Sequence, residues 1–312
     1  MPHQILTPDL VMQEGLVYMN FSRGIQATKA YRTNWLEFKH HYGASPGVVA
    51  VIWNDLCTTD IAASKLSDDE KNQRGLKYLL MVIYFLFNYP RSRHSFKKLF
   101  DVNDKYASGK FFWTWVSRIA GLKEKVIKFP EEFSDPNGRP FIMSLDCRDH
   151  KVWEKKHPRF NLDRNYSSHK HGMHAALKYE LGLALFSDQI CWISGPYNGK
   201  RSDLTIFRTG GLKQKCLQEC PGKYVVADLG YRSSEPDETM LLIPNSKHPL
   251  PLKKFLSLGR CREEDMNARM AKWKVLSHEF EHSIAKHEIC YVSVAVIIQY
   301  QLDNDDAFLT KL

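Results

Sequence analysis

Apolar runs of strand length, each followed by acidic or turn residues, characterise the second half of the chain. Residues 141–145 and 224–227 are two such runs, and an aspartate follows each of them directly, Asp146 and Asp228. Short apolar runs between turn signals are typical of buried strands, whereas longer stretches with helical spacing predict helices. The predicted strands cover residues 141–146, 175–186, 189–194, 223–228 and 240–244, and the predicted helices cover 263–283 and 288–302. Strands followed by helices predict an α/β or α+β fold in which helices cover a sheet.

The first half of the chain has a helical pattern. Two helical stretches before residue 67 are separated by a turn at residues 43–47. Ser67 is a strong N-cap because acidic residues follow it in the first turn, and it predicts a helix that continues through the apolar run 78–87. Turn residues between Pro130 and Pro140 then mark the predicted boundary between a helical region, 1–130, and a second domain, 140–312.

Two shorter helices are predicted at about 92–100 and 108–121, joined by a polar link. This arrangement resembles a helix-turn-helix, in which Lys110 and Arg118 of the second helix would contact DNA. The alternative is an ordinary helical pair that packs its aromatic side chains into a core.

Composition narrows the class of partner. The 312 residues include 44 Lys and Arg against 35 Asp and Glu, a formal charge of +9, which favours an anionic partner such as nucleic acid over a neutral one. A basic surface that serves only solubility is the alternative. The seven cysteines are scattered and odd in number, which predicts reduced thiols rather than a disulfide framework. The longest apolar run, ten residues, is too short to cross a bilayer, so we expect a soluble protein.

Three acidic residues carry the predicted chemistry: Asp146, Asp228 and Glu264. The two aspartates end apolar strands, where an unpaired carboxylate is costly to bury, and Glu264 lies on the first predicted helix after them. Carboxylates that converge from two strand ends and a helix could hold Mg²⁺ or Mn²⁺, because oxygen ligands suit these ions. The alternative is that the aspartates are surface turn residues. Asp203 is either a helix N-cap beside a glycine-rich turn or a further residue of the site.

A dense basic tract covers residues 148–178 and has aromatic side chains interleaved. Beside a metal site such a tract could follow a phosphate backbone and stack bases, although a solvated loop is the alternative. His169, His171 and His174 have no cysteine or carboxylate at ligand spacing nearby, so structural zinc is not favoured. The candidate phosphate contacts are Arg148, Lys151, Lys155, Lys156, Lys200 and Arg269.

Five motifs in order resemble the DDE transposase domain of the PIF/Harbinger superfamily, which includes the Harbinger transposase-derived nucleases. The motifs lie at residues 144–149, 177–181, 192–207, 226–232 and 260–269, and residues 38–46 resemble the N-terminal region of the same group. Two departures stand out. Cys147 and Arg148 replace the Gly-Thr that follows the first aspartate in the family, and the stretch 153–166 is longer and more basic than usual.

The resemblance implies an RNase H-like mixed sheet flanked by helices and preceded by an all-α region. It implies catalytic acids at Asp146, Asp228 and Glu264, with Asp203 corresponding to a recurrent family aspartate. The expected activity is that of an endonuclease or transposase, in which two Mg²⁺ or Mn²⁺ ions activate water or a DNA 3′-hydroxyl.

Two other classes of function stay open from the sequence. One is a domesticated protein that keeps the fold and binds DNA or protein without cleaving; the other is a metallohydrolase for a small phosphoester. The expected partner is DNA, and the sequence leaves open a separate DNA-binding partner protein and a homo-oligomer. The expected location is the nucleus in a eukaryote and otherwise the cytoplasm. The sequence does not determine the DNA target.

Overall fold

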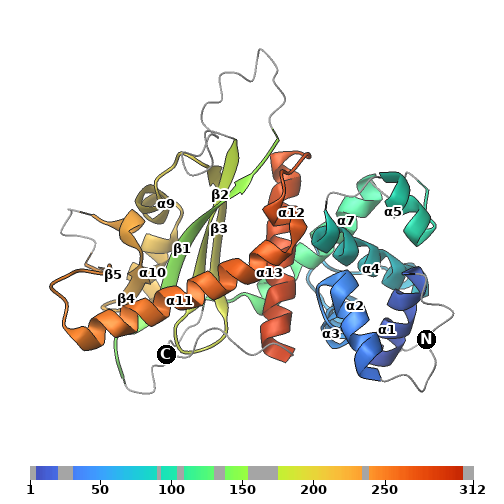
Figure 1. The fold of residues 1–312 in the computed structure, drawn as a ribbon, viewed down its shortest axis with the longest axis horizontal. Helices are drawn as coiled ribbons and strands as arrows, with labels where there is room; N and C mark the ends of the chain where they lie inside the picture. Colours follow the sequence, from blue (N-terminus) through green and yellow to red (C-terminus); the bar gives the residue numbers. More distant parts are fainter. Residues whose placement is uncertain are drawn as a thin grey trace, which may run out of the picture. The chain divides into compact units, whose positions relative to one another are not determined.

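A computed structural model of the chain describes residues 5–19, 31–89, 93–103, 109–129, 138–153, 175–233 and 239–304. The chain divides into two compact units, a helical unit and a sheet unit (Figure 1). The helical unit comprises Met1–Val126, Met270–His278 and Ala285–Ala307; the sheet unit comprises Ile127–Arg269, Glu279–Ile284 and Phe308–Leu312. The last described helix therefore groups with the N-terminal helices, whereas the sequence predicted a second domain running from 140 to 312.

The helical unit is built around α4, Gln73–Asn88, whose apolar run is buried along most of its length. Ser67, the predicted N-cap, forms a capping box with Glu70, but this box begins only the short 3₁₀ helix η1, Asp68–Glu70. Asn72 is the N-cap of α4, because its side chain accepts from the N–H groups of Arg74 and Gly75. The other helices are α1 (Pro8–Tyr18), α2 (Tyr31–Tyr42), α3 (Pro46–Thr58), α5 (Arg93–Phe100), α7 (Lys110–Gly121), α8 (Lys123–Val126), α12 (Lys274–Ser277) and α13 (Ile284–Asn304).

α13 is tied to the N-terminal helices by buried polar contacts. Ser293 donates to the carbonyl of Val116 on α7 at 2.9 Å, and the Tyr300 hydroxyl donates to Asp55 on α3 at 2.5 Å. Each contact links residues far apart in the sequence. A pattern of apolar spacing predicts the helix itself but not its neighbours, so the grouping of α13 was not predictable from the sequence.

α5 and α7 are the pair that resembled a helix-turn-helix. Nine residues separate them, whereas the turn of that motif has about three or four. On α7 the aromatic residues Phe112, Trp113 and Trp115 are buried, as the alternative of a packed helical pair requires. Lys110 is exposed at the start of α7.

The sheet unit contains five strands in the order β3-β2-β1-β4-β5. β1, β2 and β3 form an antiparallel meander, whereas β4 and β5 run parallel to β1. This mixed sheet with helices on it confirms the predicted fold class, and its order is that expected of an RNase H-like sheet. The strands are β1 (Phe141–Lys151), β2 (Ala176–Ala184), β3 (Ile190–Asn198), β4 (Tyr224–Ala227) and β5 (Leu241–Leu242).

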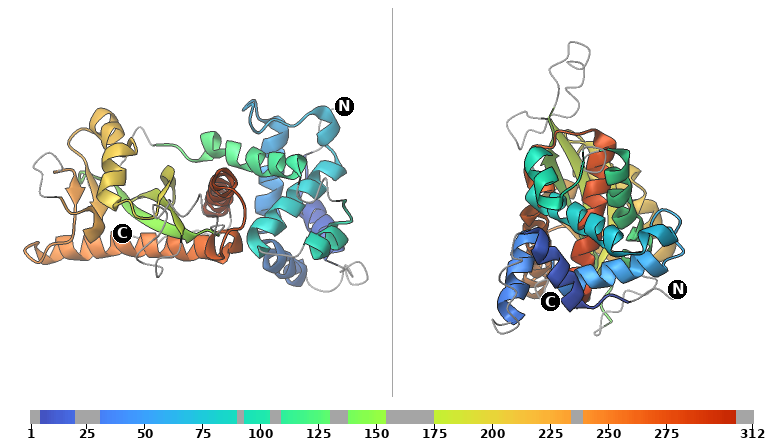
Figure 2. Two further views of the ribbon diagram at one scale, coloured as in Figure 1. Left: turned by 90° about the horizontal axis from the view of Figure 1, so that it is seen from above. Right: turned by 90° about the vertical axis from the view of Figure 1, so that its right-hand side faces the viewer.

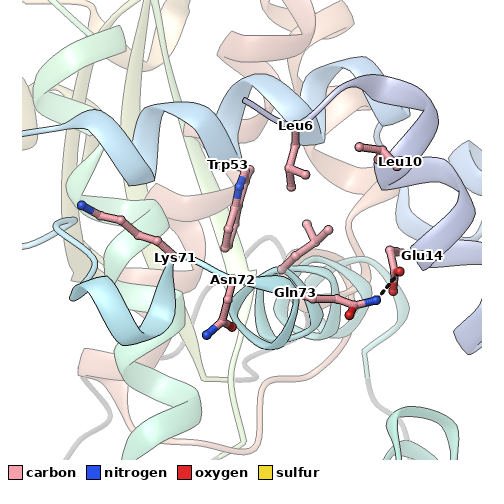
Figure 3. A pocket seen from close by; sticks show the side chains of 8 residues that line it. Leu6, Leu10, Glu14, Trp53, Lys71, Asn72 and Gln73 are labelled. Carbon is pink, nitrogen blue, oxygen red and sulfur yellow. Dashed lines mark hydrogen bonds between the residues drawn. The ribbon is translucent and has the colours of Figure 1, made fainter. Parts of the chain in front are cut away.

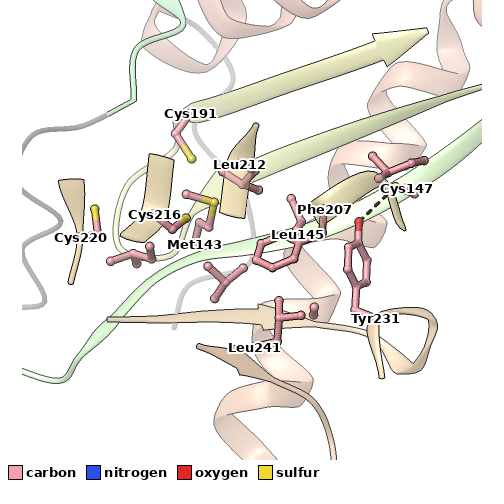
Figure 4. Packing of buried hydrophobic residues seen from close by; sticks show 14 of the residues in the cluster. Met143, Leu145, Cys147, Cys191, Phe207, Leu212, Cys216, Cys220, Tyr231 and Leu241 are labelled. Carbon is pink, nitrogen blue, oxygen red and sulfur yellow. Dashed lines mark hydrogen bonds between the residues drawn. The ribbon is translucent and has the colours of Figure 1, made fainter. Parts of the chain in front are cut away.

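Helices cover both faces of the sheet (Figure 2). On one face α9, Asp203–Thr209, and α10, Leu212–Glu219, bury Phe207 and Leu212 against β1 and β4 (Figure 4). On the other face α11, Leu250–Lys272, packs Phe255 and Leu256 against Val226 of β4 and Leu185, which follows β2. Six of the seven cysteines are buried, and all seven are free thiols, as the sequence predicted.

Two elements are longer than the sequence predicted. β1 continues five residues beyond Asp146, so this aspartate lies within the strand rather than at its end. α11 begins at Leu250, whereas the predicted helix began at residue 263. Pro251 lies in the first turn of α11, where the missing N–H of a proline costs the helix no hydrogen bond. None of the helices in the described ranges is both long and apolar enough to cross a membrane.

Candidate functional site: an acidic cluster between two strands and a helix

Asp146 and Asp228 are brought together by the pairing of β1 and β4. The strands are parallel neighbours, with Leu145 opposite Ala227, so the two aspartates follow a matched pair at the same level of the sheet. Neighbouring strands lie about 4.8 Å apart, which places the two carboxylates side by side. β4 ends before Asp228, whose Oδ1 accepts from the N–H of Gly230 at 2.8 Å and caps the short 3₁₀ helix η4, Leu229–Tyr231. The strands that lead to the two predicted acids are therefore neighbours in the sheet.

The third carboxylate near this pair belongs to Glu263, not to Glu264. Glu263 on α11 is 5% exposed, and its charge interacts with those of Asp146 and Asp228. Glu264 is exposed on the same helix. The sequence analysis selected Glu264, the other member of this adjacent pair, and a shift of one residue rotates a helical side chain by about 100°. Met266 and Met270 are buried. Their spacing from residue 263 is that of one helix face, which was the signal that could have identified Glu263.

Burial and mutual repulsion disfavour the ionised forms of these carboxylates. Burial raises the pKa of Glu263 well above its usual range, and the charges of Asp146 and Asp228 raise it further, while an interaction with Ser144 opposes them. Burial likewise raises the pKa of Asp146; the charge of Asp228 adds to this, and a hydrogen bond from Asn267 opposes it. A cluster of acids that destabilise one another as anions is one in which a cation would be strongly favoured.

α11 and β1 are linked by two hydrogen bonds at this site. The Asn267 amide donates to Asp146 Oδ2 at 2.8 Å, and Arg148 Nη1 donates to the main-chain carbonyl of Asn267 at 2.5 Å. Arg148 was predicted to contact phosphate, but here its guanidinium holds the helix. The sequence offered no signal for Asn267, because an amide within a helix has no characteristic pattern.

Asp203 lies on the other face of the sheet. Met143, Leu145 and Cys147 of β1 pack toward α9 and α10, so the alternation of side chains directs Asp146 to the α11 face. Asp203, the first residue of α9, pairs at 2.9 Å with Lys178, which is also 3.7 Å from Asp149. Asp203 was considered as a metal ligand and as an N-cap; Ser202 is the cap.

Gly230 lies between Asp203 and Asp228. A Cβ at this glycine would be 2.5 Å from Asp203 Oδ2 and 3.0 Å from Asp228 Oδ1. Both carboxylates therefore approach the η4 backbone closely, and the lack of a side chain at position 230 is required by that approach.

A further buried acid, Glu180, is hydrogen-bonded by neutral partners. The Trp192 indole N–H donates to Glu180 Oε2 at 2.9 Å, and the Tyr231 hydroxyl donates to Oε1 at 3.5 Å. Tyr231 also contacts the Cys147 thiol at 3.1 Å (Figure 4). Burial raises the pKa of Glu180 to about 8, although the hydrogen bonds from Trp192 and Tyr231 oppose the shift.

The predicted phosphate contacts differ in their surroundings. Lys151 at the end of β1 and Lys200 after β3 are exposed. They flank Ala176, which pairs with Lys151 and accepts from the N–H of Gly199. Arg118 of α7 is 2.7 and 2.8 Å from the two carboxylate oxygens of Glu70, so its guanidinium is already paired. Arg269 is half-buried. Lys155, Lys156, His169, His171 and His174 lie outside the described residues.

A pocket of about 290 Å³ lies within the helical unit (Figure 3). Leu6, Leu10, Trp53 and Leu76 give it an apolar lining, and Gln73 hydrogen-bonds Glu14 at its edge. None of the acidic cluster lines this pocket, so its volume is no guide to the chemistry of the sheet unit.

The donor set of the acidic cluster suits a divalent cation. Among the described residues, no group of three His, Cys, Asp or Glu side chains is arranged as a ready set of metal ligands. The three carboxylates nevertheless supply only oxygen donors, which Mg²⁺ and Mn²⁺ prefer. Glu263 Oε1 is buried and has no hydrogen-bond partner among the described residues. A buried carboxylate oxygen without a donor is costly, and a cation would satisfy it while reducing the electrostatic repulsion among the three groups.

Residues 145–299 match the family model of the DDE superfamily endonucleases. This segment begins one residue before Asp146 and includes Asp228 and Glu263, so it contains the whole acidic cluster. The match supports the broader part of the resemblance, a DDE transposase family. The narrower assignment to the PIF/Harbinger superfamily stays a prediction. No curated protein and no solved structure matches the chain.

Proposed function

We propose that the sheet unit is a metal-dependent nuclease or transposase that acts on DNA phosphodiester bonds, with Asp146, Asp228 and Glu263 as its catalytic acids. The proposal is supported by the pairing of the strands that lead to Asp146 and Asp228, and by the interaction of the buried Glu263 carboxylate with the charges of both aspartates, within the segment that matches the endonuclease family. Glu263 takes the role that the sequence assigned to Glu264.

Each acid has a role that its position allows. Asp146 and Asp228, side by side on adjacent strands, would provide oxygens to a shared cation, and Glu263 would provide its unpartnered Oε1 from the helix. Divalent cations bound there would activate the attacking oxygen and stabilise the leaving oxygen. On the family resemblance we further propose two bound ions and the reaction expected of the PIF/Harbinger superfamily, in which the ions activate water or a DNA 3′-hydroxyl.

Asp203 is better suited to a supporting role than to metal ligation. Its Oδ1 is engaged by the Lys178 ammonium, and its Oδ2 faces Gly230 rather than the α11 side of the sheet. The ion pair with Lys178 offsets part of the charge of Asp203, but this charge still contributes to raising the pKa of Asp146.

The DNA strand would be held by cations near the cluster. Lys151 and Lys200 are exposed at one end of the meander, and Lys151 lies five residues along β1 from Asp146, a distance of about 16 Å at strand geometry. We include both among the proposed phosphate contacts, together with the tract around Lys155 and Lys156. Arg118 is not included, because its guanidinium is paired with the Glu70 carboxylate. A partner protein, self-association and a nuclear location stay predictions of the family resemblance.

The experiment is plasmid nicking with Mn²⁺, combined with thermal unfolding with and without the ion. Wild type is expected to nick and to be stabilised by Mn²⁺, whereas Asp228→Asn should lose both properties and keep its fold and DNA affinity. The substitution conserves volume but removes the charge and replaces an acceptor oxygen with a donor amide. Asp60→Asn, at an exposed position of the helical unit, is the matched control.

Two outcomes would contradict the proposal. If wild type neither nicks nor gains stability with Mn²⁺ but binds DNA, the protein is a binding module that keeps the fold. If Asp228→Asn nicks as wild type does, Asp228 is not a catalytic ligand.

A further inference from the structure

Asn267 is placed where a helix side chain can control one oxygen of a candidate metal ligand. It follows Glu263 by four residues on α11, so the two side chains lie on the same helix face. Glu263 interacts with Ser144, and Asn267 donates to Asp146, two residues further along β1. Side chains two residues apart lie on the same face of a strand. The hydrogen bond from Asn267 to Asp146 therefore links the helix to the strand at the acidic cluster.

The contact is reinforced from the strand. Arg148, again two residues further along the same face of β1, donates to the carbonyl of Asn267 at 2.5 Å. One bond runs from helix to strand and the other from strand to helix, so they fix both the main chain and the side chain of this residue. A side chain held in this way keeps its geometry without a further loss of conformational freedom when a ligand binds.

The chemistry of the amide distinguishes position 267 from the acids around it. An amide N–H can donate to a carboxylate, which an ionised Asp or Glu cannot do. Its bond opposes the rise in the pKa of Asp146 that burial and Asp228 cause. The amide also adds no charge to a site that already contains three acids.

We propose that Asn267 is a positioning residue of the acidic cluster: its amide holds Asp146 Oδ2 and so orients the carboxylate that would bind a divalent cation together with Asp228 and Glu263. This inference rests on the proposed function. Asn267 acts through Asp146, and Arg148 acts through Asn267. The predicted consequence is that cation affinity depends on residue 267 even though the residue itself is not a ligand.

The test is Mn²⁺ binding measured by calorimetry, with thermal unfolding of the metal-free protein as a second readout. Asn267→Ala should weaken Mn²⁺ binding about tenfold or more, as loss of a partner that orients a metal ligand commonly does. Asn267→Asp should lower the unfolding temperature of the metal-free protein, because a fourth carboxylate would face Asp146. Mn²⁺ should reduce this difference in unfolding temperature between the variant and wild type. Ala268→Asp, which adds the same charge at the next, exposed position, is the control and should show neither effect.

The outcomes separate this inference from the proposed function. If wild type binds Mn²⁺ and Asn267→Ala binds it equally well, the positioning role is wrong and the proposed metal site stands. A change in unfolding temperature with unchanged Mn²⁺ affinity would also overturn it, because a merely structural role gives that result. If wild type binds no Mn²⁺, the proposed function fails and this inference fails with it.

Discussion

At the scale of single residues, the molecule separates acids that look equivalent in the sequence. Glu263 and Glu264 are neighbours on α11, but only Glu263 lies with Asp146 and Asp228. Asp203 is also buried, yet it pairs with a lysine, whereas Glu180 is surrounded by neutral donors. The role open to each carboxylate is therefore set by its partners and not by its residue type.

Glu180 gives a prediction about pH. Its pKa of about 8 in the folded protein lies above the value of 4.5 usual for glutamate, so the folded state binds a proton that the unfolded state releases first. The stability of the wild type should consequently fall as the pH rises from about 5 to 8. Glu180→Gln removes this titration and keeps an acceptor for Trp192. It should thus gain stability relative to wild type with rising pH, by at most about 5 kcal/mol.

Urea unfolding at pH 5 and pH 9 measures the effect. Glu219→Gln, at an exposed helix end, is the control and should follow the wild type at both pH values. Charged groups near Glu180, including Asp203, are present in all three proteins, so they cancel in the comparison. Parallel curves for Glu180→Gln and wild type would show that Glu180 does not titrate in this range.

At the scale of elements, strands were easier to predict than the contacts among helices. Apolar runs identified β1 and β4 because a strand buried on both faces has few polar positions. The same runs identified Asp146 and Asp228, since parallel neighbours bring equivalent positions to one level. The buried face of α11 was not identified, because the prediction missed the start of the helix at Leu250. Without that start, either residue 263 or residue 264 could be assigned to the face that packs on the sheet. Asn267 and Arg148 depend on tertiary contacts that no local pattern contains.

The η4 turn after β4 can be tested through Gly230. Gly230→Ala would place a methyl group 2.5 Å from Asp203 Oδ2 and 3.0 Å from Asp228 Oδ1, so at least one carboxylate must move. We expect Mn²⁺ affinity to fall about tenfold, which is typical when the support of a ligand is disturbed. Leu229→Ala, at an exposed neighbouring position, should leave the affinity unchanged. Calorimetric titration with Mn²⁺ measures both; equal affinities in all three proteins would mean that Asp228 tolerates the displacement.

A substitution at Arg118 on α7 can show whether this side chain stabilises the helical unit or contacts DNA. Its guanidinium pairs with Glu70 and lies 4.8 Å from the Trp115 ring centre. Arg118→Met would leave Glu70 without this partner and should lower the free energy of unfolding by about 1–3 kcal/mol. DNA affinity should not change. Lys110→Met, at an exposed position of the same helix, should have the opposite profile if α7 contacts DNA. Urea unfolding and a DNA-binding titration measure the two effects; unchanged stability with weaker DNA binding by Arg118→Met would restore the original prediction.

At the scale of the whole molecule, the net charge of +9 and an acidic cluster have to be reconciled. A polyanionic substrate is repelled by carboxylates, so cations must lie along its path and neutralise its phosphates. The exposed Lys151 and Lys200 meet this requirement in the described part of the sheet unit. The sign of the net charge follows from the sequence alone, whereas the fold determines which cationic side chains are exposed and can contact a phosphate.

This arrangement predicts a steep salt dependence of DNA binding. Lys151→Glu and Lys200→Glu should each weaken binding on any DNA sequence and reduce the slope of log K against log salt by about 1 for each phosphate that is no longer neutralised. Lys223→Glu changes the same charge at the start of β4, the end of that strand away from Asp228, and should have a smaller effect. Binding titrations at several salt concentrations measure the slopes. Equal slopes for all variants would show that the two lysines do not contact phosphate.

The central claim is that Glu263, with Asp146 and Asp228, forms the metal site of a DDE nuclease. The most direct measurement compares Glu263→Gln with Glu264→Gln for Mn²⁺-dependent plasmid nicking and for stabilisation by Mn²⁺. We predict that Glu263→Gln loses both and is more stable than wild type without metal, because folding no longer has to protonate this buried carboxylate or bury its charge. Glu264→Gln, changed at an exposed position of the same helix, should behave as wild type. Loss of nicking and of stabilisation by Mn²⁺ in Glu264→Gln, with Glu263→Gln unaffected, would contradict the account.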